Sequence, residues 1–433
     1  MSTTANAKTI ASFSSAHGLG VLCALTAGVW LGAAEAPTKL VNSGLSPYAI
    51  SLCMVAGVFT ARWTVPTLLK GTRYVFADLN LNRHLILNAI LAGMLWAVAN
   101  TLTVFAIRDV GLTIAFPLWN TNSLVGILWG RLLFGELKGA STRNIAKVIL
   151  GALAIVAAAI MLGFSTIHSD APHAHRALSG ILAAAGASLL WGTMYIPYRK
   201  AYISVMNPLS FVTVFTIGEL GTCFALVLAF DGGTSAAVFH SPETKHLLFW
   251  LFLGGFAWVI GDLFQQFATK YLGIGRAIPL SNTNQLWGLA WGALVFGELA
   301  HSDWPHRLLV LFGSLVMIAG AVAVSTAVAT EREHTSTNSA LLRECSRYGL
   351  DYGRVLAALS GSSHTNPNDS RDRRGWWDYA ILTVAAGTFV YLGLNARVPA
   401  LTMDFAWVWI LAAVLGATVL VAGGRLWKTT RFS

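Results

Sequence analysis

A stretch of 21 residues occurs twice in this chain, and the repetition constrains the fold more than any other feature. The copies read PLWNTNSLVGILWGRLLFGEL, from Pro117, and PLSNTNQLWGLAWGALVFGEL, from Pro279. When residues 111–137 are aligned with residues 273–299, 16 of 27 positions are identical. A chain that repeats itself in this way is built from two copies of one structural unit.

Apolar runs long enough to cross a bilayer recur along nearly the whole chain. The sequence is 55% hydrophobic and 11% charged, whereas a soluble domain carries about a quarter charged residues and a crossing helix needs roughly 20 apolar residues. We therefore predict an all-α integral membrane protein. The expected spans are 17–37, 47–69, 85–106, 112–133, 146–165, 178–198, 209–230, 247–269, 274–296, 308–327, 377–396 and 404–424.

The repeat covers five spans in each copy. Downstream of the duplicated stretch, Gly151 corresponds to Gly313 in the same register. Because five is odd, the second copy enters the membrane from the opposite side, which gives an inverted repeat. Many transporters have this architecture, since exchanging the conformations of the two halves opens the protein alternately to each side. We predict two inverted five-helix repeats, at 1–165 and 166–327.

The remaining residues have no counterpart in the repeat. The linker at 328–376 is polar but carries apolar residues at helical spacing, which predicts an amphipathic helix. This helix lies either on the inner membrane surface or on the protein's own loops. The last two spans, at 377–433, are expected to form an accessory hairpin. The apolar stripe consists of Leu341, Leu342, Cys345, Tyr348, Tyr352, Val355, Leu356 and Leu359.

The distribution of Lys and Arg predicts the orientation. If the N-terminus is cytoplasmic, 22 of the 29 basic residues fall on the inner side, Arg62 among them, and 6 fall on the outer side. By the positive-inside rule, we expect a multi-pass protein of the cell (inner) membrane with both termini cytoplasmic. This asymmetry accounts for the net charge of +10, so no nucleic-acid partner is expected. The oligomeric state stays open, with a homodimer among the options.

The stretch LWAVANTLTVFAIRDVGLTIAFPL, followed by LLFGEL, resembles the bacterial glucose/ribose porter family of the drug/metabolite transporter superfamily. The shared pattern is W-A-x-x-N or D, a glycine, a proline, a polar triplet at mid-membrane and F-G-E at the helix end. The resemblance covers roughly 17–327 and implies a ten-span transporter for sugar uptake. This chain departs from the family in having Asn-Thr-Asn where the triplet is usually rich in Ser and Thr, and in residues 328–433.

An Asn-Thr-Asn triplet lies at the centre of each duplicated span and supplies Asn120, Asn122, Asn282 and Asn284. An amide in hydrocarbon is costly without partners, and a carboxamide offers both a donor and an acceptor, which suits sugar hydroxyls. Residues two apart on a helix point to nearly opposite sides, so one asparagine of each triplet is expected to face ligand and the other to tie helices. The alternative is that all four only tie helices. The equal depth of the triplets favours a substrate site.

Two acidic residues lie inside spans of the second repeat. Glu219 is near the centre of the seventh span, and Asp262 takes the position that Asn100 holds in the first repeat. An acid in lipid faces a cavity or pairs with a base, and burial favours the protonated form that a proton carrier needs. We expect no base at the depth of Glu219, so we predict that it carries a proton. For Asp262, proton transfer and a structural ion pair are equally open.

Three further residues are predicted to contact the substrate. Trp96 and Trp258 hold corresponding positions, each one helical turn before Asn100 or Asp262, and Gln266 follows Asp262 by one turn. Tryptophan stacks on sugar rings, although anchoring at the membrane interface is its commoner role.

The other conspicuous residues are interpreted as structural. Phe-Gly-Glu at 134–136 and 296–298 ends each duplicated span, with the glutamate expected in solvent. Glu35 is expected to pair at the interface, and the four cysteines to form no disulfide. The histidines of one outer loop are expected to be solvated rather than to bind metal. They are His168, His173 and His175.

The sequence contains no phosphate-binding Gly-Lys-Ser motif, no His-Glu-x-x-His and no nucleophile elbow. We therefore expect no enzyme activity, no cofactor and no metal. The prediction is a proton-coupled secondary transporter of a small polar solute, with a sugar as the first choice, surrounded by membrane lipid. The rivals are a transporter of nitrogenous metabolites such as ureides, an exporter of cationic drugs, and a non-transporting scaffold or sensor.

Overall fold

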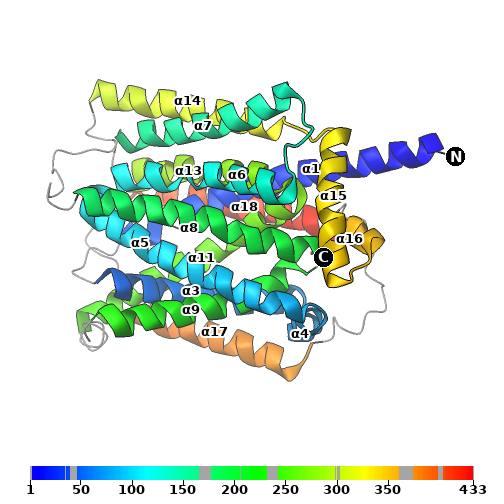
Figure 1. Ribbon diagram of the computed structural model, residues 1–433. Helices are drawn as coiled ribbons and strands as arrows, with labels where there is room; N and C mark the ends of the chain where they lie inside the picture. The colour runs from blue at the N-terminus through cyan, green and yellow to red at the C-terminus, as the bar shows by residue number, and fades with distance from the viewer. Residues whose placement is uncertain are drawn as a thin grey trace.

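The computed structural model describes residues 2–34, 36–39, 46–164, 177–204, 206–231, 242–297, 299, 303–359, 374–397 and 403–432. Within these residues the protein is helical and has no β-strand (Figure 1). Ten of the described helices are long and apolar enough to cross a membrane. The structure thus confirms the predicted all-α integral membrane fold.

The helices of the first repeat are α1 (Ser2–Ala33), α2 (Ala36–Lys39), α3 (Pro47–Leu69), α4 (Thr72–Leu81), the 3-10 helix η1 (Arg83–Leu85), α5 (Ile86–Trp119), α6 (Asn122–Phe134) and α7 (Thr142–Phe164). Those of the second are α8 (Ala177–Ile203), α9 (Pro208–Phe230), α11 (Pro242–Leu272), α12 (Ile274–Ser281), α13 (Asn284–Ala290), the π-helix η3 (Trp291–Val295) and α14 (Trp304–Ser325). The extension holds α15 (Glu331–Tyr348), α16 (Tyr352–Leu359), α17 (Trp376–Asn395) and α18 (Phe405–Thr430).

Two of the expected spans, 112–133 and 274–296, are not single helices. Helical backbone stops at Trp119 and resumes at Asn122 in the first repeat, and stops at Ser281 and resumes at Asn284 in the second. Both breaks fall on the Asn-Thr-Asn triplets, three residues after a proline, which lacks the backbone N–H of a regular helix. Broken helices at corresponding positions are the usual binding elements of transporters with inverted repeats.

The two repeats interlock rather than stand side by side. The most extensive contacts pair α1 and α3 with α11, α5 with α8 and α9, and α7 with α14, so each pair joins one repeat to the other. Figure 1 shows α7 and α14 together at one edge of the bundle, and α3 with α9 toward the opposite edge, next to α17.

Four glycines bring α3 onto α11 and α9 onto α5. A Cβ atom at Gly57 or Gly218 would lie 2.1 Å from a carbonyl oxygen of the facing helix, and one at Gly93 or Gly255 would lie 2.0 Å away. Small residues allow such close approach in lipid. The same contact occurs twice, between corresponding positions of the two repeats. The facing carbonyls belong to Phe252, Ile90, Phe215 and Met54.

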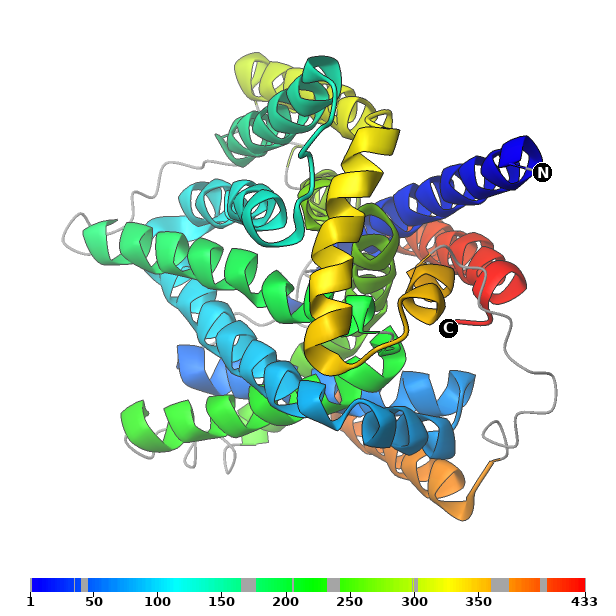
Figure 2. The ribbon, with the colours of Figure 1, turned by 45° about the vertical axis from the view of Figure 1, so that its right-hand side comes forward.

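The polar linker packs on the protein itself. It forms two helices, α15 and α16, because Gly349 ends α15 with a φ of +64°. Leu341 and Cys345 of the apolar stripe are buried in the main core cluster, and α15 lies across one end of the bundle (Figure 2). Of the two predicted placements, the structure therefore shows packing on the protein's own loops.

The last two helices do not form the hairpin we expected. α17 contacts α3 and α11, whereas α18 contacts α1 and η3, and the two lie apart in both views (Figure 1, Figure 2). Phe389 of α17 packs edge-on against Phe252 and Phe256 of α11. Each helix therefore packs against the repeats.

Candidate functional site

The two Asn-Thr-Asn breaks meet each other in the protein interior. Asn282 Nδ2 donates to Asn122 Oδ1 over 2.9 Å and to the backbone oxygen of Asn120 over 3.2 Å. Asn120 and Asn282 are 3% and 5% exposed. Among the described residues, Asn120 Nδ2 and Asn284 Oδ1 have no hydrogen-bond partner. One asparagine of each triplet is thus tied to the other repeat, and one retains an unused polar atom.

Helices α1 and α8 hold the two breaks in place. A Cβ atom at Gly32 of α1 would lie 2.3 Å from the backbone oxygen of Asn284. Gly192 corresponds to Gly32 in the second repeat, and a Cβ there would lie 3.1 Å from the backbone oxygen of Asn122. The Thr121 and Ser188 hydroxyls are 2.7 Å apart. Each break therefore lies directly against a helix of the other repeat.

An ion-pair cluster lies among α3, α9 and α11. Arg62 Nη1 donates to Glu219 Oε2 over 2.9 Å, and Arg62 Nη2 donates to Asp262 Oδ2 over 2.8 Å. All three side chains are fully buried. The expectation that no base lies at the depth of Glu219 was wrong, as was the assignment of Arg62 to the inner surface.

Aromatic and amide side chains surround this cluster. The Arg62 guanidinium lies 4.2 Å from the Phe215 ring centroid and 5.5 Å from that of Trp258. Trp258 and Trp96 meet edge to face, with ring centroids 5.0 Å apart. Gln266 Nε2 donates to Asp262 Oδ2 over 2.6 Å. The structure thus brings together Glu219, Asp262, Gln266, Trp96 and Trp258, all singled out from the sequence.

Several buried polar atoms of the cluster lack a partner among the described residues. They are Arg62 Nε, Glu219 Oε1, Asp262 Oδ1, Tyr198 Oη and Trp96 Nε1. Most buried polar groups in proteins are hydrogen-bonded, so these donors and acceptors leave hydrogen-bonding capacity unused inside the core.

The corresponding positions of the first repeat form a neutral cluster. Asn100, which corresponds to Asp262, donates to Ser51 Oγ over 2.8 Å. The Ser51 hydroxyl lies 3.6 Å from the Cys223 sulfur. When the paired glycines are superposed, Cys223 of α9 takes the position of Arg62 of α3. The charged cluster therefore occurs on one side of the pseudo-symmetric core only.

Sequence reasoning missed Arg62 and Glu136. Arg62 stands inside a predicted span, and an arginine at that place is itself a signal of a buried partner. Glu136 of the first Phe-Gly-Glu is not solvated as expected: it is 3% exposed and accepts hydrogen bonds from the backbone of α12. Several other predictions lie outside the described residues. They concern Glu35, His168, His173, His175 and Glu298.

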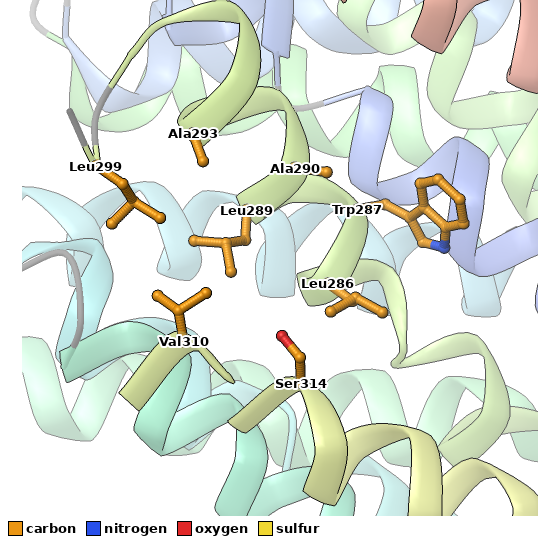
Figure 3. Close-up of a pocket in the computed structure, with 8 residues that line it drawn as sticks. All are labelled: Leu286, Trp287, Leu289, Ala290, Ala293, Leu299, Val310 and Ser314. Atoms are coloured by element: carbon orange, nitrogen blue, oxygen red, sulfur yellow. The ribbon is translucent and has the colours of Figure 1, made fainter. Parts of the chain in front are cut away.

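A groove of about 230 Å³ lies apart from these residues, between α14 and the helices α13 and η3 (Figure 3). Its lining is almost wholly apolar, with the Ser314 hydroxyl and the Trp287 indole as polar groups, and it includes none of the predicted site residues. It is therefore not the candidate site. The lining residues are Leu286, Trp287, Leu289, Ala290, Ala293, Leu299, Val310 and Ser314.

The fold places the chain among membrane proteins built from two inverted repeats around broken helices. The family of sugar transport proteins matches residues 18–167 and 182–350. This is more than half of the chain, and the chain belongs to that family. The match runs through α15, so the extension that begins at residue 328 is partly a family feature, in contrast to our expectation.

Relatives named after sugar uptake match shorter segments. The chain is 27% identical to one from Enterococcus faecalis over 128 residues, 29% of this chain and 40% of the relative. It is 27% identical to one from Listeria monocytogenes over 162 residues, which are 37% of this chain and 50% of the relative. It is 39% identical to one from Streptococcus pyogenes serotype M1 over 79 residues, which are 18% of this chain and 26% of the relative. The aligned segments thus span half or less of these relatives.

A solved crystal structure aligns over 72% of this chain and 96% of its own, with 15% identity and a TM-score of 0.47.

Proposed function

We propose that the protein is a secondary transporter that takes up a small neutral sugar together with protons. The observation that carries the proposal is the cluster of Arg62, Glu219 and Asp262, which pairs one base with two acids in the protein interior. Two ionised carboxylates beside one guanidinium leave one net negative charge, and a single proton removes it. Buried charges are costly unless neutralised, so the cluster has a physical reason to bind a proton.

The sugar would bind between the two breaks and the tryptophan pair. Asn120 Nδ2 and Asn284 Oδ1 supply an unused donor and acceptor, and hydroxyl groups can satisfy both. Family membership and the names of the relatives support a sugar as the solute.

Coupling would follow from the geometry of the charged cluster. Arg62 belongs to α3 of the first repeat, whereas both of its partners belong to the second repeat. Protonation of either carboxyl weakens a bond between the repeats. The two halves could then move relative to each other, as alternating access requires.

An exporter of organic cations is the second candidate, because acids and aromatic rings surround one point of the core. The Arg62 guanidinium already lies 4.2 Å from the Phe215 centroid, where a bound cation would stack. A resident cation disfavours a foreign one, so we place the sugar first.

The test is transport by the purified full chain in proteoliposomes. We expect uptake of radiolabelled glucose or ribose to rise when the outside is made acidic, and a protonophore to remove the increase. Counterflow, which needs no net proton movement, should persist. Empty liposomes, the ureide allantoin and a labelled organic cation serve as controls. Sugar uptake that does not change with the pH gradient would exclude proton coupling. Uptake of the organic cation without uptake of either sugar would exclude a sugar as the substrate.

We also propose that both termini face the cytoplasm. Arg143 begins α7 at the end of the bundle that carries α15, and Leu178 begins α8 at the opposite end; both are exposed. A cysteine at Leu178 should react with an impermeant thiol reagent in intact cells, and one at Arg143 should react only in inverted vesicles. The reverse pattern would invert the orientation.

A further inference from the structure

The two broken helices are joined directly at the end of the bundle that carries α15. Glu136, just after α6, accepts hydrogen bonds from the backbone N–H groups of Ile274 (3.0 Å) and Gly275 (2.8 Å) at the start of α12. Arg199 Nε lies 3.5 Å from the same carboxylate. Because α6 and α12 belong to different repeats, Glu136 connects the two halves.

A second connection runs through α15. Glu333, which is 2% exposed, accepts a hydrogen bond from the backbone N–H of Leu137 over 3.0 Å. The same carboxylate pairs with Arg276 of α12, at 2.8 Å from Nη1 and 2.9 Å from Nη2. Glu333 therefore holds the end of α6 and the start of α12 at once.

The segment that leads into α15 secures this end further. Arg276 Nε donates to the backbone oxygen of Ala327 over 2.7 Å. His17 Nε2 of α1 lies 2.8 Å from the backbone oxygen of Ser325, and Thr330 donates to the backbone oxygen of Gly139 over 3.2 Å. Helix α15 is thus positioned by contacts with both repeats.

The helices in contact here lead to the proposed sugar site. Ile278 of α12 is fully buried, and a Cβ atom on Gly126 of α6 would lie 2.6 Å from its Cδ1. Asn282 follows four residues later, at the break. The contact between α6 and α12 therefore lies between the asparagine breaks and the end of the bundle that carries α15.

We propose that Glu136 and Glu333 form the gate that closes this end of the transport path. The proposal rests on alternating access as proposed above. Both carboxylates are buried and satisfied only while the helix ends are together. If the helix ends separate before water enters, the Glu136 carboxylate and its backbone N–H donors lose their hydrogen bonds, and Glu333 and Arg276 become unpaired charges. Both changes are costly. The gate is thus stable either closed and dry or open and hydrated, and not in between.

The test measures access to the α6–α12 contact and needs no substrate, so its failure differs from failure of the transport proposal. Ile278→Cys is the reporter in a chain whose four native cysteines are alanine. Its labelling by an impermeant thiol reagent is followed in vesicles of both orientations. Glu136→Gln and Glu333→Gln should each raise labelling from the α15 side by roughly tenfold or more, since removing one partner of a buried ion pair is strongly destabilising. Arg343→Gln, on the exposed face of α15, should leave it unchanged.

A second reporter separates gating from general loosening. Ala106→Cys lies in a fully buried position near the opposite end of the bundle. If the gate proposal holds, its labelling stays unchanged in both glutamine variants. Glu333→Asp, which keeps the charge on a shorter side chain, then labels Ile278→Cys at a rate between those of the unchanged gate and Glu333→Gln. Equal increases at both reporters, or unchanged labelling in a folded Glu333→Gln protein, would overturn the proposal. If a glutamine variant does not fold, Glu333→Asp must still label at an intermediate rate.

Discussion

The α3–α11 contact and the α9–α5 contact are two copies of one interface with different chemistry. In both, glycines lie so close to backbone carbonyls that an added Cβ atom would be 2.0–2.1 Å from the carbonyl oxygen. The first continues into the pair of Arg62 with Asp262, at 2.8 Å. At the second, Asn100 and Cys223 take the corresponding positions, and both lie next to the Ser51 hydroxyl. Backbone packing is duplicated, whereas charge is not.

This difference separates two requirements of an alternating transporter. Under the proposed function, motion between two equivalent states needs equivalent packing on both sides, and the paired glycines would supply it. Coupling to an ion needs one site whose charge changes, and a single copy is enough for one proton per cycle. The predictions below test whether the two interfaces divide these roles, in order of decreasing expected effect.

The largest effect should come from the acids of the charged interface. We expect Glu219→Gln and Asp262→Asn each to abolish uptake driven by a pH gradient, because neither amide can bind a proton, while counterflow survives in at least one of them. Asn100→Ala, at the neutral interface, should keep its response to pH. Full acid-stimulated uptake by both variants would show that the proton is carried elsewhere.

Loss of the shared base should be the most destabilising single change. Arg62→Met leaves two buried carboxylates without a cationic partner, and breaking a buried pair in this way costs about 3–5 kcal/mol. Thermal unfolding in detergent should report the loss. Cys223→Ala, at the corresponding position, should cost about 1 kcal/mol or less. The triple variant Arg62→Met/Glu219→Gln/Asp262→Asn should recover most of the stability; if it is as unstable as Arg62→Met, charge is not the cause.

The glycines should show the opposite behaviour, namely equal effects at both interfaces. Gly93→Ala and Gly255→Ala each place a methyl group 2.0 Å from a backbone oxygen, and such overpacking costs about 1–3 kcal/mol. Gly221, which has open space around its Cα, provides the matched control as Gly221→Ala. A large cost at one interface only, measured by the same unfolding assay, would contradict equivalent packing.

The smallest effects should separate the asparagines. Asn282 donates two hydrogen bonds between the repeats, so Asn282→Ala should lower the unfolding temperature. Asn120→Ala removes an unused amide donor, so it should weaken sugar binding by about 0.5–1.5 kcal/mol, or roughly 2- to 13-fold, with little change in stability. Isothermal titration with the transported sugar measures the affinity. Normal binding by alanine variants of all four asparagines would leave them a purely structural role.

The sequence predicted those features that the repeat itself encodes. The duplicated stretch predicted that the two Asn-Thr-Asn triplets lie at corresponding places inside the protein, and the apolar runs predicted the spans, whereas the helix breaks at the triplets were not predicted. Trp96 and Trp258, paired from the alignment alone, lie in contact. Residues that correspond in the two repeats and lie at the two-fold axis are neighbours. The alignment of an inverted repeat therefore predicts contacts between spans, which the sequence of a single span cannot do.

Contacts between residues that do not correspond escaped the prediction. Arg62 is 157 residues from Glu219 and 200 from Asp262, and no periodicity relates them. Glu136 accepts hydrogen bonds from backbone N–H groups, which every residue except proline carries, so no side-chain pattern marks its partner. The linker helix was ambiguous for a similar reason: its apolar stripe fits a membrane surface and a protein surface equally well.

The interlocking of the repeats also bears on how the protein is made. Arg62 enters the membrane before the ribosome has produced either of its partners, and Glu219, the first of them, follows 157 residues later. At a synthesis rate of about 5–20 residues per second, this interval lasts roughly 8–31 s. Throughout it, α3 must hold an unpaired guanidinium at a depth where an arginine is expensive. The first repeat is therefore incomplete by itself, because the Arg62 charge is neutralised only after the second repeat has entered the membrane.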